Sequence, residues 1–288
     1  MKTILGIVGS PRKLGNCEIM VKEISRGIAE PHELRLLRLS DFDIQPCRGC
    51  YLCLFQEKGC VIQDDAQAVL DAILAADALI VSAPTYFLGP NAGLKRLLDR
   101  GIAFYPHMEQ MWGKPAVGVG IAGIPGREGY SRLGIESFLR LMFTEVKACR
   151  ILYGALPGEV FMDDENRKAA KEMADALFRP AAPAAGPCCP LCGGDTFRFL
   201  GGDRIQCMLC SNSGTIRISR AAPVLTTERG EHELFLTRED ALRHREWLVS
   251  MKSRFLAHKN DLKAISIGYR HDGTWIRPAA PRPTTEDA

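Results

Sequence analysis

The fold is decided by the stretch Gly9–Cys17, GSPRKLGNC, together with the segments on either side of it. The apolar run Thr3–Gly9 before it is typical of a buried strand, and the amphipathic pattern of Asn16–Ala29 after it predicts a helix. A loop at such a junction meets the free N–H groups and the positive dipole end of the helix, which favour a phosphate group. The stretch therefore predicts a phosphate-binding loop, and a polar surface turn that caps the helix is the alternative.

The side chains of this loop suit a phosphate group. Ser10, Asn16 and the thiol of Cys17 offer neutral hydrogen bonds, and Arg12 offers a charged guanidinium fork. The loop lacks both Gly-x-Gly-x-x-Gly and Gly-x-x-x-x-Gly-Lys-Ser/Thr, which weakens the dinucleotide and P-loop interpretations.

Outward from the loop, residues 1–178 alternate short apolar runs with longer amphipathic ones. Continuous apolar runs are typical of parallel strands that are covered on both faces. The alternation predicts a doubly wound α/β fold with a five-stranded parallel sheet in the order 2-1-3-4-5. The expected strands are Thr3–Gly9, Glu33–Leu39, Ala78–Ala83, Ala116–Ala122 and Ala148–Gly154, and the expected helices are Asn16–Ala29, Asp64–Ala75, Asn91–Ala103, Gly129–Phe143 and Asp164–Phe178.

Composition and charge exclude several classes of function. The chain of 288 residues is 46% hydrophobic and 25% charged, as in ordinary globular proteins. Its net charge of +3 gives no electrostatic reason to expect nucleic acid or an anionic membrane surface as a partner. No apolar stretch approaches the length of a membrane span, and the first residues lack the features of a signal peptide. A cytoplasmic location is therefore expected.

Eleven cysteines are unusual for a reducing compartment, where disulfides are not expected. Four of them follow the pattern Cys47-x-x-Cys50-x-x-Cys53 with Cys60 seven residues later. Two successive two-residue gaps allow one loop to wrap several thiolates around a cubane, whereas zinc commonly takes two separated pairs. The pattern favours a 4Fe–4S cluster, and free thiols buried under the loop are the alternative.

A second cysteine group has a different spacing. Cys189 and Cys192 form one Cys-x-x-Cys knuckle, and Cys207 and Cys210 form another. Two such turns complete a tetrahedral site of four thiolates, which resembles a zinc ribbon. Structural zinc is expected here, with a rubredoxin-like iron as the alternative because first-row metals share this geometry. Cys188 is left over, since Cys189 has the correct spacing.

The shifts in composition predict four regions. The helical pattern Leu236–Ala257 starts with a Thr237-x-x-Asp240 capping signal, and its mixed charges are typical of a solvated face. The regions are an α/β domain over 1–178 with a cysteine loop at 44–62, a Pro-rich linker over 179–187, a zinc-ribbon-like domain over 188–222 and a helical extension over 223–288.

The α/β region resembles a known family at three loops. Gly-Ser-Pro-Arg-Lys-x-x-Asn after the first strand is similar to the FMN phosphate loop of the NAD(P)H-dependent FMN reductases, which have a flavodoxin-like fold. The segments 83–87 (APTYF) and 122–126 (AGIPG), and the helix sequence of 92–100, resemble the flavin loops of that family and their continuation. The resemblance implies FMN, held by Ser10, Arg12, Asn16, Cys17, Pro84, Thr85, Tyr86, Phe87, Gly123 and Gly126.

The cysteine loop narrows this resemblance. Cys-x-x-Cys-x-x-Cys-x(6)-Cys after the second strand, followed by Val61-Ile62-x-Asp64-Asp65, is similar to the iron–sulfur flavoproteins. That resemblance covers roughly residues 1–178 and implies FMN, a 4Fe–4S cluster on Cys47, Cys50, Cys53 and Cys60, and assembly as a homo-oligomer.

The expected function is an FMN-dependent oxidoreductase that passes electrons between NAD(P)H or a ferredoxin-type carrier and a small-molecule acceptor. Two alternatives stay open. The first is an FMN-only NAD(P)H-dependent reductase without a cluster, and the second is a redox-responsive binding or regulatory module that docks a partner through the zinc ribbon. No catalytic acid or base is predicted, because electron transfer requires none, and His107 is assigned no role.

Overall fold

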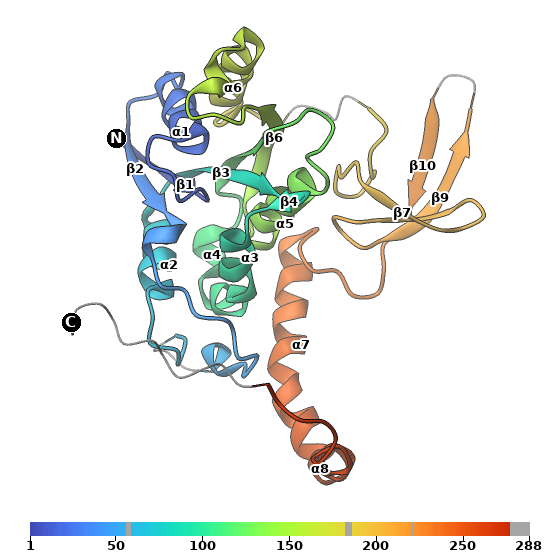
Figure 1. Cartoon of the computed structure of the whole chain (residues 1–288). Helices are drawn as coiled ribbons and strands as arrows, with labels where there is room; N and C mark the ends of the chain where they lie inside the picture. Colours follow the sequence, from blue (N-terminus) through green and yellow to red (C-terminus); the bar gives the residue numbers. More distant parts are fainter. Residues whose placement is uncertain (56–58, 182–185, 220–221, 277–288) are drawn as a thin grey trace, which may run out of the picture. The chain divides into compact units, whose positions relative to one another are not determined.

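Five parallel strands form the central sheet of the computed structural model (Figure 1). They are β1 (Lys2–Val8), β2 (His32–Arg38), β3 (Ala78–Tyr86), β5 (Pro115–Ala122) and β6 (Glu145–Tyr153). Their order is β2-β1-β3-β5-β6, and each neighbouring pair is parallel. A two-residue strand, β4 (Gly89–Pro90), pairs antiparallel with the end of β3. The doubly wound fold and the strand order expected from the sequence are confirmed.

The structure describes residues 1–55, 59–181, 186–219 and 222–276. These include the helices α1 (Asn16–Arg26), α2 (Ala66–Ala75), α3 (Ala92–Asp99), α4 (Met108–Met111), α5 (Ser131–Leu141), α6 (Asp164–Ala176), α7 (Arg238–Ala257) and α8 (Lys259–Gly268). Short 3-10 helices are formed by Leu39–Asp41, Leu52–Leu54, Gly101–His107 and Glu159–Phe161. No helix of the described residues is long and apolar enough to cross a membrane.

The two faces of the sheet carry separate hydrophobic cores, because side chains along a strand alternate between faces. In β1, Ile4 and Val8 pack with the buried residues of α1 and α6, while Leu5 and Ile7 pack with those of α2, α3 and α5. Strands covered on both faces explain the unbroken apolar runs in the sequence.

The expected helix Asn91–Ala103 is shorter in the structure. The α-helix ends at Asp99, and the chain continues through Arg100 into the 3-10 helix Gly101–His107. Gly101 is a poor helix former and Pro106 has no backbone N–H, so the α-helical hydrogen bonds cannot continue through this segment.

A four-stranded antiparallel sheet follows the α/β region. It consists of β7 (Phe197–Gly201), β8 (Arg204–Cys207), β9 (Ser213–Ile218) and β10 (Pro223–Thr227), in the order β10-β9-β8-β7. The last strand extends the sheet past residue 222, where the ribbon-like domain was expected to end. Within the predicted linker and extension, residues 182–185 and 277–288 lie outside the described residues.

The start of α7 follows the predicted capping signal. The N–H of Thr237 donates to Asp240 Oδ2 at 2.9 Å, and the N–H of Asp240 donates to Thr237 Oγ1 at 3.2 Å. The chain divides into two compact units. The first is Met1–Glu246, and the second begins at Trp247, with residues 247–276 described.

Candidate functional site

A cavity of about 200 Å³ opens at the carboxyl ends of β1, β3, β5 and β6. Parallel strands place their carboxyl ends at one edge of the sheet, where ligands bind in open α/β folds. Eight of the ten residues predicted to hold FMN line this cavity: Ser10, Arg12, Asn16, Cys17, Pro84, Thr85, Tyr86 and Gly123. Phe87 and Gly126 are not among the lining residues. The sequence analysis missed Ile121, Gly154 and Ala155, which complete the wall.

The loop between β1 and α1 is shaped by a buried carboxylate. Leu14 has a positive φ of 54°, and its N–H donates to Glu18 Oε2 at 2.8 Å. Glu18 also pairs with Lys22 and Arg38, each at 2.6 Å. Burial opposes the charged form of Glu18, but the hydrogen bonds from Lys22, Leu14 and Arg38 outweigh it and lower the pKa of the carboxyl. A charged Glu18 therefore fixes the turn that leads into α1.

Asn16 and Cys17 line the cavity, but their side chains are also engaged within the protein. Asn16 Nδ2 donates to the carbonyl of Gly154 at 2.9 Å, and its Oδ1 accepts from the N–H of Gly158 at 2.8 Å. Both polar atoms of its side chain thus have protein partners. Burial raises the pKa of the Cys17 thiol to about 12, so this group is neutral at ordinary pH. Ser10 and Arg12 remain as the polar side chains of the loop that suit a phosphate.

The turn between β3 and β4 presents aromatic side chains beside the cavity. Phe87 and Leu88 have positive φ values of 48° and 67°, and the side chain of Phe87 is fully exposed. The turn is held by Tyr130, whose N–H donates to the Leu88 carbonyl at 2.7 Å. A Cβ atom on Gly89 would lie 2.3 Å from Cζ of Tyr130, so a larger residue there would displace the tyrosine ring. The turn after β3 is therefore joined to the residue that precedes α5.

In the cysteine loop, the thiol of Cys53 lies within electrostatic reach of the other three. Burial, and then the charges of Cys60, Cys47 and Cys50, raise the pKa of the Cys53 thiol to about 11. Cys53 is buried, Cys50 is exposed, and Cys47 and Cys60 are half-buried. A loop in which three cysteines act electrostatically on a fourth suits the four-thiolate ligand set of a 4Fe–4S cluster.

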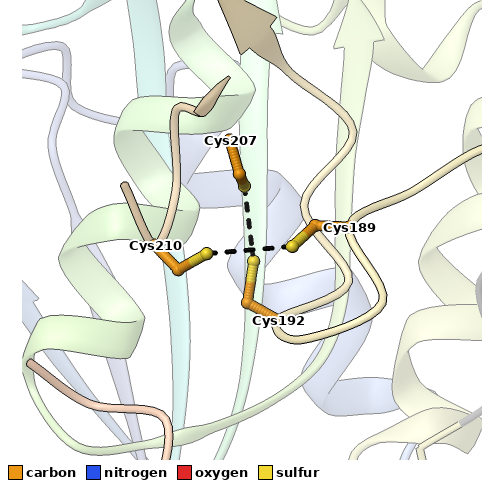
Figure 2. Close-up of side chains that lie close together, drawn as sticks. All are labelled: Cys189, Cys192, Cys207 and Cys210. Carbon is orange, nitrogen blue, oxygen red and sulfur yellow. Dashed lines mark hydrogen bonds between the residues drawn. The ribbon is translucent and has the colours of Figure 1, made fainter. Parts of the chain in front are cut away.

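The second cysteine group is closely spaced. The sulfur atoms of Cys189, Cys192, Cys207 and Cys210 all lie within 4.8 Å of one another (Figure 2). The Cys189 and Cys210 sulfurs are 3.8 Å apart, and those of Cys192 and Cys207 are 3.5 Å apart. A tetrahedral ion with metal–sulfur bonds of 2.3 Å requires sulfur separations of about 3.8 Å. These residues therefore fit a single tetrahedral metal ion.

The backbone of the first knuckle also suits a metal. Gly193 has a positive φ of 76°, and the N–H of Gly194 donates to Cys192 Sγ at 3.4 Å. A Cβ atom on Gly194 would lie 3.2 Å from Cys207 Sγ and 3.3 Å from Cys192 Sγ. The glycine leaves room for the sulfurs, and its amide stabilises a thiolate.

The Cys189 group is distinguished by its close spacing. Within the part of the chain that the structure describes, no second group of metal-ligating side chains shares the close spacing of the Cys189 group. Ligands of a cubane bind four different irons, so they need a wider spacing than the ligands of one ion.

The second cysteine group packs against α5. Leu133 and Leu141 of this helix contact the buried cluster that contains the ribbon cysteines. Arg132 pairs with Asp195 at 2.6 Å, and Arg140 Nη2 lies 3.5 Å from the carbonyl of Cys192. The ribbon thus contacts the helix that follows the predicted flavin loop after β5.

The sequence of this chain is similar to those of known flavoproteins. A family model described as NADPH-dependent FMN reductase matches residues 2–156. An iron–sulfur flavoprotein from Methanocaldococcus jannaschii is 41% identical over 98 residues, which cover 34% of this chain and 50% of that protein. An iron–sulfur flavoprotein from Archaeoglobus fulgidus is 28% identical over 178 residues, which cover 62% of this chain and 79% of that protein. The match to the first relative thus spans half of its length.

The similarity to one of the solved structures extends beyond the α/β region. A flavone reductase superimposes with a TM-score of 0.73 over 96% of this chain and 100% of that protein. The sequence identity is 19%, so this likeness concerns the fold alone.

Proposed function

Because this chain belongs to the NADPH-dependent FMN reductase family, we propose that it is an FMN-dependent oxidoreductase that also carries a 4Fe–4S cluster. The observation that supports FMN most strongly is the cavity at the edge of the sheet, which gathers eight residues from three separate predicted loops. The iron–sulfur flavoprotein relatives and the cysteine loop at 47–60 support the cluster.

The cavity residues fit the chemistry of FMN. Arg12, Ser10 and the first N–H groups of α1 supply positive charge and donors for a phosphate. Tyr86 and Phe87 supply exposed aromatic surface, and Thr85 Oγ1 is fixed by the hydroxyl of Ser131 at 2.8 Å. Bound FMN supplies the ability to take up two electrons together and release them one at a time. The chain's own part is to orient the cofactor and to shield one side of it from water.

The cysteine residues have separate roles in this proposal. Cys47, Cys50, Cys53 and Cys60 hold the cluster, which adds one-electron transfer. Cys189, Cys192, Cys207 and Cys210 hold a structural zinc ion, because a closed site of four thiolates leaves no open coordination position for a substrate. A rubredoxin-like iron in this second site is the competing assignment, since the sulfur spacing suits both metals.

The remaining parts of the proposal concern partners and location. The electrons pass between NAD(P)H or a ferredoxin-type carrier and a small-molecule acceptor, in a homo-oligomer in the cytoplasm. The family match supports NAD(P)H, and the iron–sulfur relatives support the carrier.

Anaerobic purification followed by flavin, iron, sulfide and zinc analysis tests this proposal. The expected result is about one FMN, four irons, four sulfides and one zinc per chain. FMN without iron or sulfide would identify an FMN-only reductase, and the cluster would be withdrawn. A fifth iron in place of zinc would assign the second site to a rubredoxin-like centre. Tight, salt-sensitive retention on DNA without flavin would favour the binding module instead.

A further inference from the structure

A buried ion pair joins the two ends of the cysteine loop, outside the flavin cavity. Arg100 follows α3, and Asp64 lies four residues after Cys60. Their side chains are 3% and 1% exposed. Arg100 Nη1 donates to Asp64 Oδ2, and Nη2 donates to Asp64 Oδ1 at 3.3 Å. The contact uses both arms of the guanidinium fork, a geometry that lysine cannot reproduce.

Both partners of the pair also hold the backbone at the start of the loop. Arg100 Nη1 donates to the Gln45 carbonyl at 2.9 Å, and Asp64 Oδ2 accepts from the Gln45 N–H at 2.8 Å. Asp64 Oδ1 accepts from the N–H of Ala66 at 3.1 Å, which fixes the carboxylate to the first turn of α2. Residues 45 and 64 are thereby clamped together, and the four cysteines lie between them.

Asp43 and Asp65 form a second contact that joins the two ends of the cysteine loop. The N–H of Asp43 donates to Asp65 Oδ2 at 2.7 Å, and the N–H of Asp65 donates to the Asp43 carbonyl at 2.9 Å. This second contact needs no arginine. Loss of the Arg100 side chain therefore removes a charge from the loop without removing every bond that closes it.

Arg100 also lines a cavity together with one of the predicted cluster ligands. Arg100, Asp64 and Cys60 line the same cavity of about 180 Å³. Burial disfavours the charged guanidinium, but the hydrogen bonds to Asp64 outweigh it and raise the pKa of Arg100. A buried cation beside a thiolate stabilises negative charge on that sulfur, and hydrogen bonds and charge around the sulfurs set the reduction potential of a cluster.

We propose that Arg100 is a positioning residue for Cys60, whose guanidinium, fixed by Asp64, orients the sulfur toward the cluster and favours the reduced cluster electrostatically. This inference rests on the proposed function, because it assigns a task to Arg100 only if the loop holds a cluster. The reduced cluster carries one more negative charge than the oxidised cluster, so removal of a nearby buried cation disfavours reduction.

The test compares Arg100→Met with Arg100→Lys and with Arg96→Met, an exposed arginine of α3 that provides a matched control. Each variant is purified anaerobically as the full chain. FMN, iron and sulfide contents are measured, and the cluster potential is determined by a dye-mediated titration followed by electron paramagnetic resonance.

In Arg100→Met the equilibrium constant for cluster reduction is expected to fall about tenfold, which is about 59 mV for one electron. Arg100→Lys keeps the charge and recovers most of this shift, although its altered hydrogen bonding changes the resonance spectrum. Arg96→Met matches the wild type, and FMN content is the same in every variant. If Arg100→Met does not fold, the potential and spectrum of Arg100→Lys carry the same test.

The outcomes separate this inference from the proposed function. Wild-type protein with iron and sulfide, together with an unchanged potential and spectrum in both Arg100 variants, overturns the role of Arg100 alone. Loss of cluster from both Arg100 variants, with FMN retained and with a loaded Arg96→Met control, supports the positioning of Cys60. Wild-type protein without iron overturns both proposals.

Discussion

The side-chain amide of Asn16 bridges two loops that are 138 residues apart, because its Nδ2 donates to the carbonyl of Gly154 at 2.9 Å. Its Oδ1 accepts from the N–H of Gly158, so the same side chain binds two points of the loop that follows β6. One wall of the cavity comes from the loop after β1 and another from the loop after β6. Asn16 sets the distance between them.

Replacement of Asn16 by alanine is expected to weaken FMN binding about tenfold, because two hydrogen bonds that hold the cavity walls are lost. Asn16→Asp keeps an acceptor for the Gly158 N–H but loses the donor to Gly154, so it is expected to fall between alanine and the wild type. Fluorescence titration of the FMN-free protein measures these affinities. Lys168→Ala, at an exposed position of α6 outside the cavity lining, is the control. Equal affinities for Asn16→Ala and the control would show that the bridge does not shape the site.

Phe87 allows the backbone and the aromatic ring to be tested separately. Phe87→Gly suits the positive φ, whereas Phe87→Val places a β-branched residue there and is expected to cost about 1 kcal/mol of stability relative to glycine. Both changes remove the ring, so both are expected to weaken FMN binding to the same extent. Urea unfolding measures the first difference and flavin titration the second. Unchanged affinity in both variants would remove Phe87 from the flavin site.

The ribbon metal is tested by a pair of cysteine changes. Cys207→Ser removes one of the four clustered sulfurs, and about one metal ion per chain is expected to be lost. The segment 188–227 should then become sensitive to protease, while FMN content is retained because the cavity residues all lie in the α/β region. Cys188→Ser is the control, since Cys188 lies outside the cluster. Metal analysis by mass spectrometry and limited proteolysis give the readouts, and equal metal loss in the two variants would contradict the ligand assignment.

His244 is expected to make the stability depend on pH. Burial, and then the charge of His232, lower the pKa of His244 to about 4, from an ordinary value of 6.5. The folded state therefore favours the neutral ring. Its contribution is complete above pH 6.5 and is lost as the pH falls from 6.5 toward 4. The ring is half-exposed, so solvent screening limits the loss to about 1 kcal/mol.

His244→Gln should flatten this part of the stability curve, whereas the exposed His258→Gln should leave it unchanged. Urea unfolding at pH 7.5 and pH 4.5 provides the comparison. Identical losses between the two pH values in His244→Gln and in the wild type would contradict the assignment.

Much of this architecture could be predicted because local pattern and strand topology determine it. Apolar runs identified the strands, and parallel strands bring their following loops to one edge, so Ser10, Thr85 and Gly123 were expected to meet. The ribbon cysteines were selected by their spacing alone, and the sulfur of Cys189 lies close to those of Cys192, Cys207 and Cys210 in the structure. The roles of the predicted site residues as ligands stay predictions.

Other features depend on contacts that no local pattern reveals. Asn16 has the residue type of a phosphate ligand, but its partner Gly154 is distant in sequence. Leu88 occupies a left-handed turn position that usually selects glycine or asparagine, so the tight turn after β3 carried no sequence signal. Arg100 looked like one more residue of a helix, and only the folded chain brings it to Asp64.

The bridge between Asn16 and Gly154 also has a consequence for the order of assembly. Contacts between residues far apart in sequence form late, since a long segment of chain must close before they are made. During synthesis, which proceeds from the N-terminus, the cavity lacks one wall until the residues around 158 have been made, while the cysteine loop is already complete. On the proposed function, the chain would therefore present the ligands of the cluster before the flavin cavity is closed, and the cysteines of the ribbon last.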